Sequence, residues 1–162
     1  MISKIPTNSF DRGAASSDNN VFILYTDGAC KGNPGPGGWA AILIVNEEEQ
    51  EFSGGERNTT NNQMELMGVI QGLKAIKIPS RIKIYSDSAY IINAFTQNWI
   101  KKWLVNGWKT AGNDPVKNQN LWQDLLKLTQ PHQVEWIKVK GHSGDNYNER
   151  CDRLAVSAIP WQ

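Results

Sequence analysis

Apolar and polar positions follow two different periods along this chain, and the change of period marks its elements. The first apolar run, VFILYTDG (residues 21–28), is continuous and rich in β-branched residues, which is typical of a strand buried on both faces. We expect this strand to end at Asp27, because the next ten residues form a turn too rich in glycine and proline for a strand or helix to continue. The run at 38–45 predicts a second strand. The acidic run at 47–49, together with Gln50, predicts a hairpin turn, and a third strand begins at 51–54.

The pattern becomes helical from about residue 61 to 77. Leu66, Ile70 and Leu73 belong to an apolar stripe at helical spacing, and threonine and asparagine residues before it are candidates for the N-cap. The remaining elements predicted in this way are strands at 81–86 and 134–139, and helices at 88–95, within 97–110, at 121–128 and at 148–158. The order βββαβαααβα predicts an α/β domain with three antiparallel strands first and crossover helices later.

Four acids occupy positions in these elements that would suit a metal site. Asp27 and Asp87 fall at predicted strand ends, while Glu65 and Asp152 fall on predicted helices. Two glycines follow Glu65 at helical spacing, which favours close packing of that helix on a sheet. Carboxylates that converge select hard cations such as Mg²⁺ or Mn²⁺. Each acid alone is equally well explained as a helix or turn cap or a solvated side chain, and periodicity leaves their convergence open.

Length and composition are those of a single globular domain. The chain has 162 residues, of which 40% are hydrophobic and 20% charged, enough for one core. Its net charge of +1 indicates no particular partner. We expect residues 1–20, which are polar and aperiodic, to form a disordered tail, residues 21–159 to form the domain, and residues 160–162 to form a short C-terminal tail.

The cysteines and the hydropathy pattern indicate a compartment. Cys30 and Cys151 match no zinc spacing, so we expect free thiols in a reducing environment. No apolar stretch is long enough to span a bilayer, and the first residues contain no apolar core of a signal peptide. We therefore expect a cytoplasmic protein that makes no contact with a membrane.

Five motifs together are far more specific than any of these patterns. In chain order they are TDGACKGNPGPGGWAAIL, TTNNQMELMGVI, YSDSAY, GWKTAGNDPVKN and KGHSGDNYNERCDRLA. Over roughly residues 20–158 they closely resemble the bacterial type 1 ribonuclease H family. The resemblance implies the ribonuclease H-like α/β fold: a five-stranded mixed sheet, with three antiparallel strands first and parallel additions afterwards, and helices on both faces.

The same resemblance implies a reaction. Members of this family are endonucleases that use divalent metal ions to hydrolyse the RNA strand of RNA–DNA hybrids, leaving 3′-hydroxyl and 5′-phosphate ends. We expect Mg²⁺ as the cofactor, with Mn²⁺ as a substitute, and an RNA–DNA hybrid duplex as the partner. We expect a monomer with no obligate protein partner.

Site residues follow when the family's motifs are carried over position by position. Asp27, Glu65, Asp87 and Asp152 match the catalytic metal-binding carboxylates. His142, which lies between two glycines, matches a mobile catalytic histidine, and an imidazole exchanges protons near neutral pH. The residues that fall in segments lining the hybrid's minor groove are Asn33, Asn61, Asn62 and Gln63. Amide side chains suit the recognition of a 2′-hydroxyl, although Asn61 and Asn62 can equally cap the helix that follows.

The last implied part is a basic handle that grips the DNA strand. Its candidate residues are Trp99, Lys101, Lys102, Trp103, Trp108 and Lys109. Core packing also explains tryptophans at helical spacing, so we expect the rings to brace a protruding helix while the lysines face outward. Leu104, Val105 and Asn106 stand where the family is often strongly basic, and Asp114 adds an acid nearby. These departures predict weaker hybrid binding with unchanged chemistry.

Two other functions are compatible with parts of this pattern. A DNA strand-transfer nuclease on the same fold would share the acidic cluster but should lack the NPGPGG, TTNN and KGHSG motifs that are present here. A hybrid-binding module without catalysis should have lost at least one of the four acids, and all four are present. The motifs therefore favour the nuclease.

Overall fold

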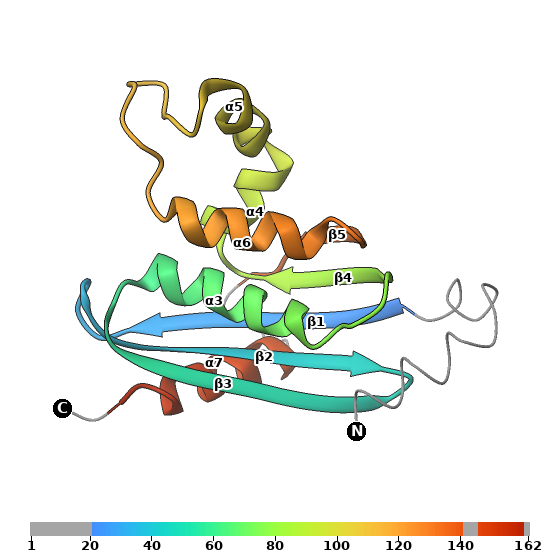
Figure 1. The fold of residues 1–162 in the computed structure, drawn as a ribbon. Coiled ribbons are helices and arrows are strands. Elements are labelled where there is room, and N and C mark those ends of the chain that lie inside the picture. The colour runs from blue at the N-terminus through green and yellow to red at the C-terminus, as the bar shows by residue number, and fades with distance from the viewer. Residues whose placement is uncertain (1–20, 141–145, 161–162) are drawn as a thin grey trace.

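A five-stranded sheet with strand order β3-β2-β1-β4-β5 forms the middle layer of the molecule (Figure 1). The structure is a computed structural model that describes residues 21–140 and 146–160. The strands are β1 (Val21–Cys30), β2 (Gly35–Val45), β3 (Glu48–Thr59), β4 (Arg81–Ser86) and β5 (Gln133–Lys138); the helices are α3 (Asn61–Lys74), α4 (Ala89–Thr96), α5 (Trp99–Asn106), α6 (Gln119–Thr129) and α7 (Asn146–Ser157). This sequence of elements confirms the predicted order.

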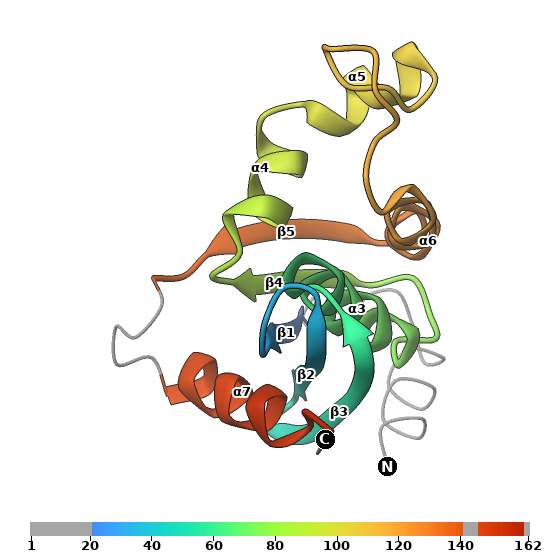
Figure 2. The same ribbon diagram turned by 90° about the vertical axis from the view of Figure 1, so that its left-hand side faces the viewer.

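The sheet is mixed, as predicted. β1 pairs with β2 and β2 with β3 in antiparallel fashion, whereas β4 runs parallel to β1 and β5 parallel to β4. α3 packs on β1 and β2, with α6 beside it, and α7 packs on the opposite face of the same two strands (Figure 2). Helices therefore cover both faces of the sheet, while α5 protrudes from the body.

Two predicted boundaries around Asp27 were wrong. β1 continues to Cys30, and β2 begins at Gly35 inside the segment that was expected to exclude strands. The reason is that β1 pairs with two neighbours over different lengths. Its register with β4 ends at Tyr25, whereas its ladder with β2 runs on to Cys30. Asp27 therefore lies just beyond the paired end of β4, and backbone hydrogen bonds to β2 hold it in place.

The hairpin between β2 and β3 also differs from the prediction. The turn consists of Asn46 and Glu47, both with positive φ (51° and 68°), and β3 already begins at Glu48. Two left-handed residues are what a two-residue hairpin turn requires, because they match the twist of the strands. The acidic residues predicted to form the turn thus belong mostly to the strand. α3 likewise ends at Lys74, earlier than the predicted residue 77.

Two hydrophobic clusters fix the layers against one another. The larger lies between the sheet, α3 and α6, and its fully buried members include Phe22, Leu24, Leu66 and Trp122. The smaller, with Ile42 and others, lies beneath α7. Each fully buried aliphatic or phenyl side chain contributes about 1.5–3 kcal/mol, so the elements that carry the acids rest on a rigid frame. Among the described residues, no helix combines the length and apolar character needed to cross a membrane.

Candidate active site

The first turn of α3 is fixed by a reciprocal cap. The Thr60 side chain accepts a hydrogen bond from the Gln63 backbone N–H at 3.2 Å, and the Gln63 side chain accepts one from the Thr60 N–H at 3.2 Å. This arrangement is a capping box, which satisfies two backbone donors that the helix start leaves free. It makes Thr60 the N-cap among the candidates, and it sets the position of Glu65, which lies just after the capping box.

Glycines then let α3 lie directly on β1. A Cβ at Gly68 would lie 3.0 Å from the backbone oxygen of Asp27, and a Cβ at Gly28 would overlap the backbone nitrogen of Glu65. Either contact would force the helix away from the strand. The prediction that the glycines after Glu65 allow close approach to the sheet is confirmed at Gly68, and Gly28 supplies the complementary gap on the strand.

Three carboxylates meet at this point. One ligand oxygen from each of Asp27, Glu65 and Asp87 lies within 4.8 Å of the other two. Asp87 follows directly after β4, so the parallel pairing of β4 with β1 brings it beside Asp27. Asp152, on α7, lies close enough to Asp27 to raise the pKa of that carboxyl further. The fold thus brings all four predicted acids together, three as a compact group and the fourth beside Asp27.

Burial and mutual repulsion decide the protonation of this group. Burial raises the pKa of Asp27 to about 8, the charge of Asp87 adds to the rise, and the Gly28 N–H, which donates to Asp27 Oδ1 at 2.8 Å, opposes it. Burial also raises the pKa of Glu65, while a hydrogen bond from Ser88 lowers it. Without a compensating cation, the cluster therefore retains a proton at neutral pH.

The donor set matches one class of metal. Carboxylate oxygens alone, with neither thiol nor imidazole among the three clustered side chains, suit hard divalent cations such as Mg²⁺ or Mn²⁺ rather than zinc. A cation would also relieve the repulsion that raises the pKa of Asp27, and Asp27 would release its proton on binding. The residues present therefore fit a divalent metal site.

Glu65 is held from two sides. The Ser88 hydroxyl donates to Glu65 Oε1 at 2.6 Å, and the Asn61 side chain also hydrogen-bonds to Glu65. Ser88 was missed in the sequence analysis. The available signal is its position: a serine directly after Asp87 and before a helical pattern is a typical N-cap, and Ser88 caps α4 through the Ile91 N–H.

Comparison with known proteins agrees with this geometry. The RNase H family model matches residues 19–160. The chain belongs to the ribonuclease H family. The ribonuclease H of Caldanaerobacter subterraneus subsp. tengcongensis is 56% identical over 143 residues, covering 88% of this chain and 94% of that protein. That of Acetivibrio thermocellus is 57% identical over 136 residues, covering 84% and 92%. The predicted membership of the bacterial type 1 ribonucleases H is confirmed.

Solved ribonuclease H structures share the fold. LC9-RNase H1, described as a type 1 RNase H with the type 2 active-site motif, superposes with a TM-score of 0.77 at 32% identity, covering 86% of this chain and 72% of that one. LC11-RNase H1, solved in complex with RNA/DNA hybrid, gives a TM-score of 0.64 at 20% identity, covering 85% and 96%. The second likeness, at its low identity, concerns the fold alone.

The residues that the ribonuclease H resemblance assigns to the minor groove lie at the start of α3 and in the turn before β2. The Asn33 side chain accepts the Asn61 backbone N–H at 3.1 Å, which joins these two segments, and Asn62 is exposed. The Gln63 side chain, by contrast, is bonded within the protein: it accepts from Thr59 Oγ1 at 2.8 Å and donates to Asn118 Oδ1 at 3.2 Å. A contact between any of these side chains and a hybrid stays a prediction.

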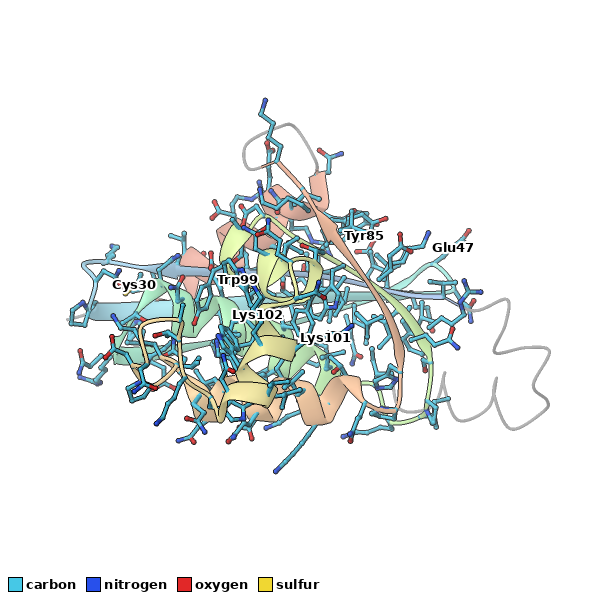
Figure 3. The ribbon with its side chains drawn as sticks, turned by 90° about the horizontal axis from the view of Figure 1, so that it is seen from above. Cys30, Glu47, Tyr85, Trp99, Lys101 and Lys102 are labelled. Atoms are coloured by element: carbon cyan, nitrogen blue, oxygen red, sulfur yellow. The ribbon has the colours of Figure 1, made fainter. Side chains whose placement is uncertain are left out.

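The handle has the predicted build. Trp103 lies at its centre, with ring centroids 6.4 Å from Trp99, 5.8 Å from Trp108 and 5.3 Å from the core residue Trp122. Lys101, Lys102 and Lys109 are exposed, and Figure 3 shows Trp99 and the first two lysines on the projecting α5. Two apolar side chains of α5 are exposed too, with Leu104 58% and Val105 84% accessible.

Two further predictions concern a histidine and the cysteines. His142 lies outside the described residues, so its position stays a prediction. Cys30 and Cys151 are free thiols, as expected. The Cys30 sulfur lies 3.4 Å from the Thr59 carbonyl oxygen and 3.6 Å from that of Gly35, so its single S–H can donate weakly to either, and Cys151 donates weakly to the Tyr25 carbonyl. Burial and the nearby charges of Asp27, Asp87 and Asp152 raise the pKa of the Cys151 thiol, which places this thiol close to the acidic cluster.

Proposed function

We propose that this protein hydrolyses the RNA strand of RNA–DNA hybrids as a metal-dependent endonuclease, leaving 3′-hydroxyl and 5′-phosphate ends. The observation that supports this most strongly is the meeting of Asp27, Glu65 and Asp87 within 4.8 Å, with Asp152 beside Asp27. The four acids come from four separate segments of the chain, so proximity in sequence does not explain their convergence. Relatives named ribonuclease H that cover most of this chain add support.

In this proposal the four acids hold Mg²⁺, with Mn²⁺ as a substitute. A bound divalent cation supplies water of lowered pKa and positive charge beside the scissile phosphate. The protein's own part is orientation: the Gly28 N–H fixes one oxygen of Asp27, and Ser88 and Asn61 fix Glu65. Asp27 must lose its proton for the full site to form. His142, two residues after Lys140, moves protons during the reaction.

Hybrid binding uses two separate surfaces. Asn33, Asn61 and Asn62 lie at the start of α3 and in the turn before β2, and amide groups suit recognition of the 2′-hydroxyls in a wide minor groove. The handle presents Lys101, Lys102 and Lys109 to the phosphates of the DNA strand, with its tryptophans as support. LC11-RNase H1, a fold neighbour, was solved with RNA/DNA hybrid. Gln63 contributes through the cap of α3 and its bond to Asn118.

One assay tests this function. End-labelled RNA–DNA hybrid, RNA duplex and DNA duplex are incubated with the protein in Mg²⁺, in Mn²⁺ and in a chelator, and the products are mapped. Internal cleavage of RNA in the hybrid alone, dependent on the metal and yielding 5′-phosphate ends, is expected. Asp87→Asn should abolish cleavage, whereas Asp124→Asn, the same change at an exposed position of α6, should not. Normal turnover by Asp87→Asn would contradict the proposed metal site.

We also propose that the protein works as a monomer in the cytoplasm. The two free thiols support a reducing compartment. Light scattering across a range of protein concentrations tests the oligomeric state, and a mass of twice 18.1 kDa would contradict it.

A further inference from the structure

The hydroxyl of Ser88 serves two elements at once. It lies 2.6 Å from Glu65 Oε1 and 3.2 Å from the Ile91 backbone nitrogen. The Ile91 N–H is a donor, so the hydroxyl accepts that bond, and its single hydrogen is left for Glu65. Ser88 is only 4% exposed. The donor toward Glu65 is therefore fixed in direction by the start of α4.

The backbone around Ser88 is fixed as well. The Ser88 N–H donates to Ser86 Oγ at 3.0 Å, and Ser86 is itself 2% exposed. Asp87 lies between these two serines. The segment that carries one proposed ligand therefore also orients another, Glu65, from a different element.

We propose that Ser88 is a positioning residue for the metal site: its hydroxyl orients the Glu65 carboxylate toward Asp27 and Asp87. This inference rests on the proposed function, because it takes Glu65 as a ligand. Groups that hydrogen-bond to ligating carboxylates typically change metal affinity or activity by about 10–100-fold when they are removed. Asn61 still holds Glu65 when the hydroxyl is absent, so a loss near the lower limit, about tenfold in Mg²⁺ affinity, is expected.

A loss of the hydroxyl also removes the cap of α4, so the experiment has to separate two effects. Ser88→Ala and Ser88→Gly both lack the hydroxyl, but glycine is the better N-cap residue. Ser88→Thr retains the hydroxyl. Mg²⁺ affinity is measured by calorimetry on the protein without substrate, and stability is measured by urea unfolding in a chelator. We expect both Ala and Gly variants to bind Mg²⁺ about tenfold more weakly, with Gly the more stable of the two, and Thr to restore affinity.

Ser80→Ala is the matched control. Ser80 is also buried, but its hydroxyl donates to the nearby Ile78 carbonyl at 2.7 Å, and it lies just before β4, at the opposite end of that strand from Asp87. The Ser80→Ala variant should bind Mg²⁺ with the affinity of the wild type. The inference is overturned if Ser88→Ala binds Mg²⁺ as tightly as the wild type. It is also overturned if Ser88→Gly regains both Mg²⁺ affinity and stability, because the cap of α4 would then explain the loss. Either result leaves the proposed function intact. A wild-type protein that neither binds Mg²⁺ nor cleaves hybrid overturns both.

Discussion

Replacing Asp27 with asparagine should stabilise the metal-free protein while abolishing catalysis. Asp27 is 6% exposed, and its neighbours Asp87 and Asp152 are acids. Asparagine has the same shape and keeps an oxygen that can accept the Gly28 N–H, which now donates to Asp27 Oδ1 at 2.8 Å. The substitution therefore removes a charge, and the backbone contact stays.

The size of the effect follows from the pKa of Asp27. Folding raises it from 3.8 to about 8, and each unit corresponds to about 1.4 kcal/mol. Between these two values the folded state holds a proton that the unfolded state has lost. The contribution of Asp27 to the free energy of unfolding is therefore fully present below pH 3.8 and is lost as pH rises toward 8. At neutral pH the raised pKa of Asp27 thus lowers the free energy of unfolding by about 4 kcal/mol. The buried amide keeps part of the desolvation cost, so we expect a gain of about 2–3 kcal/mol.

Urea unfolding in a chelator at about pH 5, 6.5 and 8 measures this difference directly. The advantage of Asp27→Asn over the wild type should grow with pH across this range. Asp124→Asn, at an exposed site on α6, should show no such trend. Added Mg²⁺ should stabilise the wild type more than the variant, since binding to the folded state adds stability. A difference that is the same at all three pH values would refute the reasoning.

Three other changes test separate parts of the molecule. His142→Ala should lower kcat by about 10²–10⁴-fold with unchanged Mg²⁺ affinity, because it removes proton transfer; an unchanged kcat at every pH would make the histidine structural. Replacing the exposed Val105 and Asn106 with lysines should lower KM at low salt and steepen the salt dependence of KM, while kcat stays constant, because lysines displace counterions from phosphates. If KM depends on salt in the same way in the variant and the wild type, the charge of α5 does not determine hybrid binding. His132 Nδ1 accepts the Ser80 N–H at 3.1 Å, and burial lowers its pKa, so its contribution to stability is present above pH 6.5 and is lost as pH falls below that value. The stability difference between the wild type and His132→Asn should therefore shrink in acid, and a constant difference in urea unfolding would contradict the assignment.

The sequence by itself determined the order of elements and the identity of the acids. Apolar runs in β1, β2 and β4 and the helical stripe of α3 depend on local periodicity, which a chain carries without its partners. The motifs that resemble ribonuclease H identified Asp27, Glu65, Asp87 and Asp152, and the structure brings these four together. Apolar periodicity was sufficient to predict the order of the elements, because it reflects which residues each helix or strand must bury.

Only the tertiary structure decided where β1 ends and what holds Glu65. Gly35 and Gly37 carry no side-chain pattern. Their part of β2 is a strand because Gly37 pairs with Cys30 of β1 and Glu56 of β3, and Gly35 pairs with Thr59 of β3. The bond from Ser88 to Glu65 joins residues 23 positions apart, and it forms only because α3 lies against β1 at Gly28 and Gly68. Strand pairing and close helix packing are contacts between distant segments, so their geometry is set by the whole fold and by no local stretch of sequence.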